Sequence, residues 1–449
     1  MKKISNKILL SPAQILAVGF AIIILAGGVL LSLPVSNRTG ESAPFLQSIF
    51  TSASATCVTG LVVCDTYSQF TMFGQIIIAM LIQIGGLGFI TLAMSFVLLS
   101  GSKISIFQRR LIMESMGSTH VGGVVKMLRR ILIGSIIIES IGAISIASRV
   151  IPKLGFGQGL WYGVFHSVSA FCNAGFDLMG YFKAGSSITL FADDPVMEIT
   201  IMLLIIIGGI GFVVWNDIVD NRFHFRNYSL HSKVMISFTL ILIVTVAALF
   251  FFIERSHAFS SMNDGEALMN SFFASITPRT AGFNSIDYND MTPAGRLLTM
   301  ISMFIGAGPG STGGGIKVTT FAAIIFSLHA SAKNYSSVSV FKRQMPDDTQ
   351  KRVLSVVLSY IMLTAVCLFI ILVSNPSITF EQGLFESLSA IGTVGLSMGI
   401  TANLNILAKI MLILLMYCGR IGSISVAVAL MRKINVTKIS YPKEKITLG

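Results

Sequence analysis

The sequence is poor in charged residues. Only 12% of its 449 residues are Asp, Glu, Lys or Arg, whereas soluble globular domains carry about a quarter. Hydrophobic residues account for 53%, and the mean hydropathy is +0.80. These values exclude a water-soluble globular protein. Apolar runs near or above the roughly 20 residues that cross a bilayer as a helix recur from end to end, so we expect an all-α membrane protein.

Cysteine is also scarce, and the sequence patterns of enzymes are missing. The five cysteines are scattered without a C-x-x-C pair or a metal-ligand spacing, which excludes a disulfide framework and a cysteine metal site. No G-x-G-x-x-G stands within a strand-helix pattern, and no catalytic constellation lies along the chain. We therefore expect neither an enzyme, nor a covalently bound cofactor, nor a nucleotide-binding domain within this chain.

Acidic residues are fewer than basic ones, 20 against 32, which gives a formal net charge of +12. In a soluble protein this excess would suggest nucleic acid as a partner, but here the basic residues lie between apolar runs. The positive-inside rule explains them better and places the basic connections in the cytoplasm. Because both ends of the chain are basic, we expect both termini to be cytoplasmic and no nucleic acid to bind.

Eight apolar runs are long enough to span a membrane, and the first lacks the A-x-A cleavage site of a signal peptide, so we expect it to stay as a span. Shorter stretches, half a bilayer long as helices, lie between the members of each consecutive pair. The runs are Ala13–Leu33, Phe70–Leu99, Met127–Val150, Val196–Val219, Val234–Ile253, Arg296–Phe326, Val353–Val373 and Ala402–Met431, and the short stretches are Ala43–Ala55, Leu160–Ala170, Ala267–Thr277 and Gly383–Ile391.

A glycine marks each short stretch in the same register. The segments SATCVTGL, SAFCNAGF, ITPRTAGF and SAIGTVGL place these glycines 115, 107 and 113 residues apart, and a Phe stands ten residues before each. Such a spacing predicts four repeats of helix, short helix and helix, covering residues 1–100, 101–222, 223–343 and 344–449. The glycines are Gly60, Gly175, Gly282 and Gly395.

The hydrocarbon of the bilayer limits where such a unit can lie. A half-length helix followed by non-helical backbone is tolerated at membrane depth only where it is buried in protein or lines a water-filled cavity. Glycine permits backbone angles that expose carbonyl oxygens, and rings of carbonyls can replace the water shell of a cation. One such glycine alone would be read as a turn or helix cap. Four in register favour a cation pore with one central axis.

Helix breakers crowd the middle of the sixth run. Six glycines and one proline lie between residues 306 and 315, although glycine costs about 1 kcal/mol and proline about 3 in a helix interior. A phosphate-binding loop is the rival interpretation, but the G-x-x-x-x-G-K-[ST] spacing is absent. Arg420 lies at a corresponding depth in the last run. An intramembrane charge faces either a water-filled pathway or a partner, so Arg420 either contacts this segment or merely ties two helices together.

These motifs resemble those of the Trk/Ktr/HKT superfamily of potassium transporters. The resemblance covers essentially the whole chain and is most specific in the four glycine segments, in TPRTAGFN (Thr277–Asn284) and in GAGPGSTGGGIK (Gly306–Lys317). Thr393-Val394-Gly395 also resembles the TVG of potassium channels. Because no extra helical hairpin precedes the first span, the chain is more similar to the Ktr membrane subunits, KtrB, than to the longer TrkH subunits.

The resemblance implies a role for each motif. It implies a potassium uptake subunit whose filter is followed by an intramembrane gating loop at 306–315. Serine in place of the first filter glycine accompanies sodium preference in plant members, so Gly60 favours potassium, while the departures from TVG leave sodium permeation or dependence open. The implied ion-coordinating carbonyls are those of Val58, Thr59, Gly60, Asn173, Ala174, Gly175, Thr280, Ala281, Gly282, Thr393, Val394 and Gly395, and the implied gate comprises Gly306, Gly308, Pro309, Gly310, Ser311, Thr312, Gly313, Gly314, Gly315 and Arg420.

The resemblance also implies partners and a location. We expect a homodimer in the bacterial plasma membrane, surrounded by lipid and contacted from the cytoplasm by a separate KtrA-like ring that binds ATP or ADP. The alternative function is an ion-coupled secondary transporter with alternating access. Such transporters are often built from inverted repeats, whereas the four repeats here run in the same direction, which favours a pore.

Overall fold

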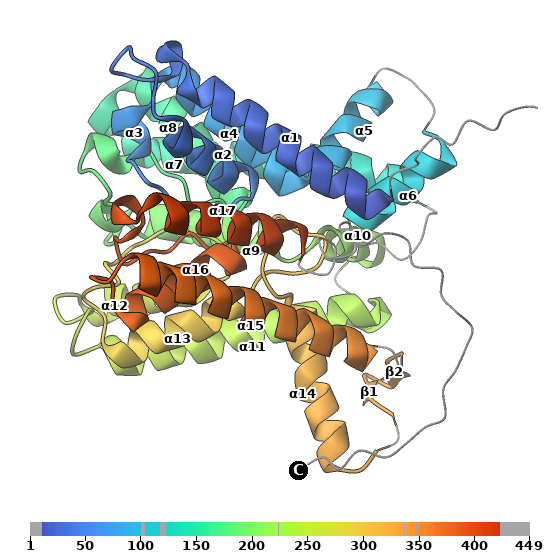
Figure 1. The fold of residues 1–449 in the computed structure, drawn as a ribbon. Coiled ribbons are helices and arrows are strands. Elements are labelled where there is room, and N and C mark those ends of the chain that lie inside the picture. The colour runs from blue at the N-terminus through green and yellow to red at the C-terminus, as the bar shows by residue number, and fades with distance from the viewer. Residues whose placement is uncertain are drawn as a thin grey trace, which may run out of the picture.

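The computed structural model describes residues 11–99, 104–116, 123–222, 224–335, 337–346 and 349–422. Within these ranges the regular secondary structure is helical apart from one two-stranded antiparallel hairpin, β1 (Ser339–Val340) and β2 (Arg343–Gln344). The long helices run side by side from one end of the molecule to the other (Figure 1). The small elements α3 and α12 lie at the left-hand end in that view, and α5, α6 and α10 lie at the right-hand end.

Four successive groups of helices follow the predicted order of a first helix, a shorter helix and a second helix. The first helices, α1, α7, α11 and α15, are long and apolar enough to cross a membrane. The groups are α1 (Pro12–Ser32), α2 (Phe45–Thr56), α4 (Met72–Leu87) and α5 (Phe89–Leu99); α7 (Val124–Leu154), α8 (Phe156–Phe171), α9 (Pro195–Gly209) and α10 (Phe212–Asn221); α11 (Leu230–Glu254), α12 (Asp264–Ile276), α13 (Pro293–Phe304) and α14 (Val318–Ala332); α15 (Thr349–Ser374), α16 (Phe380–Gly392) and α17 (Ile406–Ile421).

Short elements connect these groups. They are the 3-10 helices η1 (Pro34–Ser36), η2 (Met179–Tyr181), η3 (Thr189–Phe191), η4 (Phe225–Asn227) and η5 (Thr401–Asn403), and the helices α3 (Thr66–Gln69) and α6 (Ile106–Ser115).

The shorter helices α2, α8, α12 and α16 lie inside the bundle, and serine hydroxyls tie α2, α8 and α12 to the first helices of their groups. The hydroxyl of Ser52 donates to the carbonyl of Ile24 in α1 at 2.7 Å, and that of Ser167 donates to Glu139 in α7 at 2.6 Å. In the third group Ser275 makes this bond, to Ile243 at 2.9 Å. Each bond satisfies a buried hydroxyl and positions the short helix along its neighbour.

The second helix of each group begins at a capping residue. Thr71, Asp194, Thr292 and Asn405 each accept a hydrogen bond from a backbone N–H in the first turn of the helix that follows. These are side chains that favour the N-cap position because they satisfy the free N–H groups of a helix start. The chain therefore turns from the segment after each short helix into the next helix at a defined residue.

Two predicted spans are not single helices, which corrects the sequence-based expectation. The run Phe70–Leu99 is bent by 95° between α4 and α5, and the run Val196–Val219 by 92° between α9 and α10. The bends occur at Gly88 (φ +82°) and Gly211 (φ +101°), where glycine adopts backbone angles closed to other residues. The sixth run is broken between α13 and α14, as predicted, and residues 423–431 of the eighth run lie outside the described residues.

The close contact between helices at Gly208 leaves no room for a side chain at this position. A Cβ atom at Gly208 would collide with the carbonyl oxygen of Phe171 at the end of α8, whereas a Cβ at Gly157 in α8 would meet nothing within 4 Å. Gly208→Ala should therefore destabilise the protein by about 1–3 kcal/mol through overpacking. Gly157→Ala, the matched control, should be neutral or slightly stabilising because alanine is the better helix former. Thermal unfolding of both variants in detergent measures the difference, and equal midpoints would contradict this packing.

Candidate functional site

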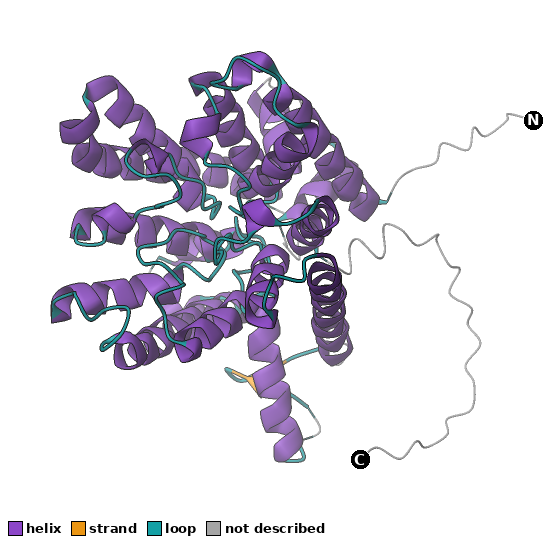
Figure 2. Ribbon diagram, turned by 60° about the vertical axis from the view of Figure 1, so that its left-hand side comes forward, coloured by secondary structure: helices purple, strands orange, loops and turns teal. Residues whose placement is uncertain are grey.

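The four repeat glycines meet around one axis. A Cβ atom built on Gly60 would lie 2.5 Å from the carbonyl oxygen of Ala174, one on Gly175 would lie 2.7 Å from that of Ala281, and one on Gly282 would lie 2.5 Å from that of Val394. A Cβ on Gly395 would collide with the carbonyl oxygen of Thr59. Each glycine thus abuts the non-helical segment that follows the short helix of the next repeat, and the fourth abuts the first, which closes a ring. We call these four segments, residues 58–60, 173–175, 280–282 and 393–395, the ring strands. Figure 2 shows the loops converging at the centre of the helices.

The backbone of the four strands repeats one conformation. Besides the four glycines, the residue two positions before each has a positive φ: Val58 (55°), Asn173 (59°), Thr280 (72°) and Thr393 (50°). Such angles are uncommon for residues with a Cβ and persist where the surrounding structure imposes them. The N–H groups of the strands point back to the short helices. For example, Thr59, Ala174 and Val394 donate to the carbonyls of Ser54, Ser169 and Ser389 at 2.7–2.8 Å.

The carbonyl groups of the same strands have no such partners. Among the described residues, none of the twelve carbonyl oxygens at 58–60, 173–175, 280–282 and 393–395 accepts a hydrogen bond from the protein. Eleven of the twelve residues that carry them are buried, and Gly395 is partly buried. Buried carbonyls are nearly always bonded, because leaving one unbonded costs about 1–3 kcal/mol. Rings of unbonded carbonyls are the kind of group that replaces the water shell of a cation, so this arrangement is chemically suited to a dehydrated cation.

A cavity of about 290 Å³ opens on one side of the ring. All four ring glycines line it, together with the carboxylates Asp65 and Asp177 and polar groups such as Asn284 and Thr401. Burial, with added repulsion from Asp65, raises the pKa of Asp177 to about 7. This cavity, which we call the vestibule, therefore presents a negative potential to an approaching cation when Asp177 is ionised.

A non-helical loop between α13 and α14 closes the other side of the ring. Its two ends pair through the N–H of Gly306 and the carbonyl of Ile316 at 2.8 Å, and it is bonded to the α9–α10 connection, where Phe212 donates to Gly310 at 2.8 Å. The hydroxyl of Thr312 donates to the side chain of Asn173 at 3.0 Å. The loop is therefore held to the segment that carries Asn173 in the ring and to the neighbouring repeat.

The glycines of this loop permit close contact with the ring segments of the third and fourth repeats. Cβ atoms at Gly313 and Gly314 would collide with the hydroxyls of Thr280 and Thr393, and one at Gly315 would lie 2.9 Å from the carbonyl oxygen of Gly392. Side chains at these three positions would push the loop away from the ring. The sequence explained these residues as helix breakers, and the structure adds that they fit where no side chain can.

Two cationic side chains hold the loop. The guanidinium of Arg420 donates to the loop carbonyl of Thr312 and to the carbonyls of Gly85 and Gly86 at the end of α4. It thus makes both contacts that the sequence left as alternatives, one with the loop and one between helices. The ammonium of Lys317 donates to the carbonyls of Gly313 and Gly314 at 2.8 and 3.1 Å. The sequence alone did not identify this contact.

Other polar groups in the bundle have structural bonds. Glu139 accepts a hydrogen bond from the side chain of Gln83 at 3.0 Å, which joins α4 to α7. His166 contacts the carbonyl of Tyr162 through Nδ1 and accepts from the N–H of Leu178 through Nε2 at 3.2 Å. It thus holds the segment that follows residues 173–175 against α8, the short helix of the same repeat. No group of three or more metal-ligating side chains occurs in the described part of the chain.

Comparison with known proteins agrees with this architecture. The profile of the TrkH family, described as cation transport proteins, matches residues 16–440. The chain belongs to the TrkH family of cation transport proteins. It is 39% identical to the potassium/sodium uptake protein NtpJ of Enterococcus hirae, over 98% of both chains, and 37% identical to the Ktr system potassium uptake protein B of Bacillus subtilis, over 100% of this chain and 99% of that one.

A solved structure shares the fold. The potassium transporter TrkH from Vibrio parahaemolyticus superposes with a TM-score of 0.74, covering 95% of this chain and 86% of that one at 17% identity. The likeness confirms the predicted all-α membrane fold with four repeats around one pore. The membership also confirms that this is a multi-pass membrane protein of a transporter family rather than an enzyme.

We expect transport to depend on the pH of the solution on the vestibule side of the membrane. Asp177, with its raised pKa, is neutral below about pH 7 and ionised above it. Raising that pH from 6 to 8 should therefore increase cation flux about twofold or more, because the added charge concentrates cations at the ring. Flux into liposomes should lose this step in Asp177→Asn and keep it in Asp290→Asn, whose carboxylate is exposed outside the vestibule. A step that survives Asp177→Asn would contradict the assignment.

Proposed function

We propose that this chain is the ion-translocating subunit of a Ktr-type potassium uptake system. The proposal is supported by the ring of twelve carbonyl oxygens without protein hydrogen bonds, eleven of which belong to buried residues. Relatives at 35–39% identity over nearly their whole lengths are named potassium uptake proteins. A cation would enter from the vestibule, exchange its water shell for carbonyls of the ring and leave past the loop.

The coordinating groups in this proposal are the carbonyls of the three residues ending in each ring glycine. The short helices α2, α8, α12 and α16 end next to these strands, so their negative dipole ends favour a cation and disfavour an anion. TVG occurs in one strand of four, so we propose a lower selectivity than that of a potassium channel. Sodium as a second or coupled ion stays within the proposal, and one relative is named for both ions.

The loop at residues 306–315 is the gate in this proposal. It lies against the filter strands through Thr312 and the three glycines at 313–315, on the side away from the vestibule. Arg420 and Lys317 satisfy its carbonyls and add positive charge to the path of a cation. An open state requires these bonds to break or rearrange, which makes them the latch of the gate.

The assembly belongs to the same proposal. We infer a homodimer in a bacterial plasma membrane, with both termini cytoplasmic and a KtrA-like nucleotide-binding ring as regulator. The names of relatives as subunits of a Ktr system support partner components. The repeat boundaries at residues 100, 222 and 343 are likewise proposed. The common direction of the repeats favours a pore over alternating access.

Replacement of the first ring glycine tests the filter. In Gly60→Ser the new Cβ would lie 2.5 Å from the carbonyl oxygen of Ala174 and distort the ring. The preference for potassium over sodium should fall roughly tenfold, the effect of losing about 1.4 kcal/mol from one ligand. Gly40→Ser is the matched control, since Gly40 also has a positive φ (71°) but has no atom within 4 Å of a built Cβ. Potassium and sodium fluxes into liposomes measure both, and an unchanged preference in Gly60→Ser would refute this filter.

Replacement of Arg420 tests the gate. Arg420→Gln removes three hydrogen bonds from a charged donor, each worth about 1.5–3 kcal/mol. Potassium flux without any regulatory partner should therefore rise about tenfold or more. Arg420→Lys keeps the charge but loses the fork that joins Thr312 to Gly85. We expect an intermediate flux in Arg420→Lys, because the positive charge remains while the bonds that join Thr312 to Gly85 are lost. A flux in Arg420→Gln equal to or below that of the native chain would contradict the role of Arg420 in the gate.

A further inference from the structure

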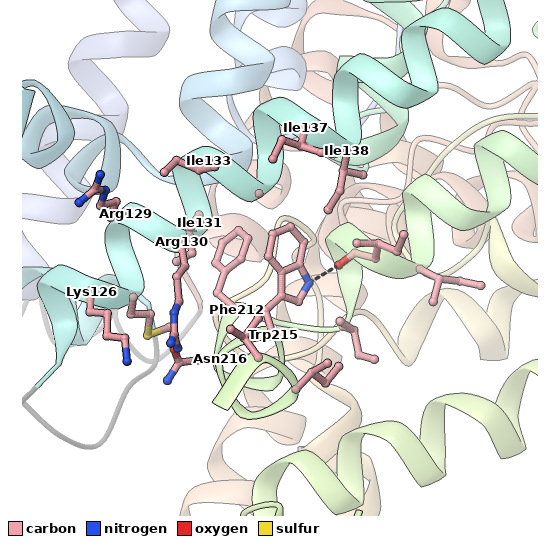
Figure 3. A pocket seen from close by; sticks show the side chains of 17 residues that line it. Lys126, Arg129, Arg130, Ile131, Ile133, Ile137, Ile138, Phe212, Trp215 and Asn216 are labelled. Carbon is pink, nitrogen blue, oxygen red and sulfur yellow. Dashed lines mark hydrogen bonds between the residues drawn. The ribbon is translucent and has the colours of Figure 1, made fainter. Parts of the chain in front are cut away.

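A large apolar groove lies on the outside of the second repeat, away from the pore. Its volume is about 720 Å³, and its walls come from α7 on one side and from the α9–α10 elbow on the other (Figure 3). Ile133 and Ile137 of α7 are 49% and 53% exposed, and Val219 of α10 is 58% exposed. The aromatic side chains of Phe212 and Trp215 lie together on the elbow side.

The groove has a basic mouth at one end. Lys126, Arg129 and Arg130 of the first two turns of α7 line it there, at the end of α7 remote from the vestibule. Arg130 pairs with Asp220 at 2.6 Å, and Lys126 is 3.6 Å from the same carboxylate with its side chain 69% exposed. Arg129 is exposed and has no hydrogen bond or ion pair among the described residues. Three cations therefore face one acidic partner.

We propose that this groove binds one phospholipid with an anionic headgroup. Its phosphate would lie between Lys126 and Arg129, and an acyl chain would fill the space between Ile137 and Trp215. The combination of an apolar slot with clustered basic residues at its mouth matches that chemistry, because basic pockets between membrane helices bind anionic headgroups. A soluble anion would have no use for the apolar walls, and a soluble protein would not reach them in the bilayer.

The surroundings of the groove support lipid rather than a second protein chain. The face of α7 that continues beyond it is apolar and exposed, with Ile136, Ile141 and Ile144 each more than 60% exposed. Such a face is expected in contact with acyl chains. The groove therefore opens from the hydrocarbon zone and ends at charges where headgroups lie, the arrangement that a bound phospholipid requires.

The elbow that forms one wall also holds the loop behind the filter. The N–H of Phe212 donates to Gly310 of that loop at 2.8 Å, and a Cβ at Gly211 would lie 2.8 Å from the carbonyl oxygen of Pro309. Trp215 packs against Phe171, the last residue of α8, with ring centroids 5.8 Å apart, and donates to the carbonyl of Ile207 at 2.9 Å. A lipid packed against Phe212 and Trp215 would thus stabilise the conformation of the elbow in which it is hydrogen-bonded to the loop. Any effect of the lipid on flux, unlike the binding itself, rests on the proposed function.

Native mass spectrometry of the purified full chain, titrated with phosphatidylglycerol or with phosphatidylcholine of identical acyl chains, tests the binding without measuring transport. Phosphatidylglycerol should bind about tenfold or more tightly than phosphatidylcholine. The double variant Lys126→Gln, Arg129→Gln should lose about tenfold or more of that affinity, since each basic residue near a membrane surface contributes about 1 kcal/mol. Arg130 is left in place because it holds Asp220 and Asn216.

Matched controls separate the groove from general effects. Arg226→Gln with Lys351→Gln removes the same charge from exposed residues outside the groove and should bind as the native chain does. Ile137→Trp should fill the slot and abolish binding, whereas Ile144→Trp, two turns along the same face of α7, should not. Equal binding of both lipids, native affinity in the Lys126/Arg129 variant, or full displacement by soluble glycerol phosphate would overturn the proposal. So would loss of a dimer in Ile137→Trp, because the groove would then be a subunit interface.

Discussion

The absence of a Cβ atom at four glycines is the constraint on which the rest of the structure depends. Each ring glycine lies so close to the carbonyl oxygen of the next strand that any side chain would separate the two strands. Closing the ring brings twelve carbonyls together without hydrogen bonds, an arrangement that costs free energy until a ligand supplies the missing interaction. The short helices, their serine bonds to the first helices and the capped starts of the second helices all hold these strands in that position.

The same principle extends to the side behind the filter. The loop at 306–315 reaches the ring because its glycines leave room for Thr280 and Thr393, and the elbow at Gly211 comes close to its carbonyls. The glycines of the loop and of the elbow at Gly211 therefore lie where a side chain would prevent these close contacts. Arg420 then supplies donors where helix ends and the loop leave carbonyls free. Filter, loop and elbow form one bonded unit, so a change at the elbow can reach the ring through few atoms.

The sequence predicted the parts of this unit that repeat. Four glycines at nearly equal spacing identified the short helices and the strands, because the periodicity is a property of the chain itself. The bends at Gly88 and Gly211 were missed, since hydropathy reports how apolar a run is and not its direction. Asp177 was missed because its place in the vestibule depends on how the segment after the strand folds back. The contacts of Lys317 could not be predicted from the sequence, because an ammonium next to a broken helix can reach carbonyls that a straight helix would not present.

Anomalous scattering of thallium ions in crystals of this protein would show whether the carbonyls of the four strands coordinate one cation. We expect a thallium peak on the axis of the ring, between the carbonyl oxygens of Thr59, Ala174, Ala281 and Val394, and a weaker peak in Gly60→Ser crystals. A native ring without any peak, at a thallium concentration that supports flux, would mean that these carbonyls do not form the ion site.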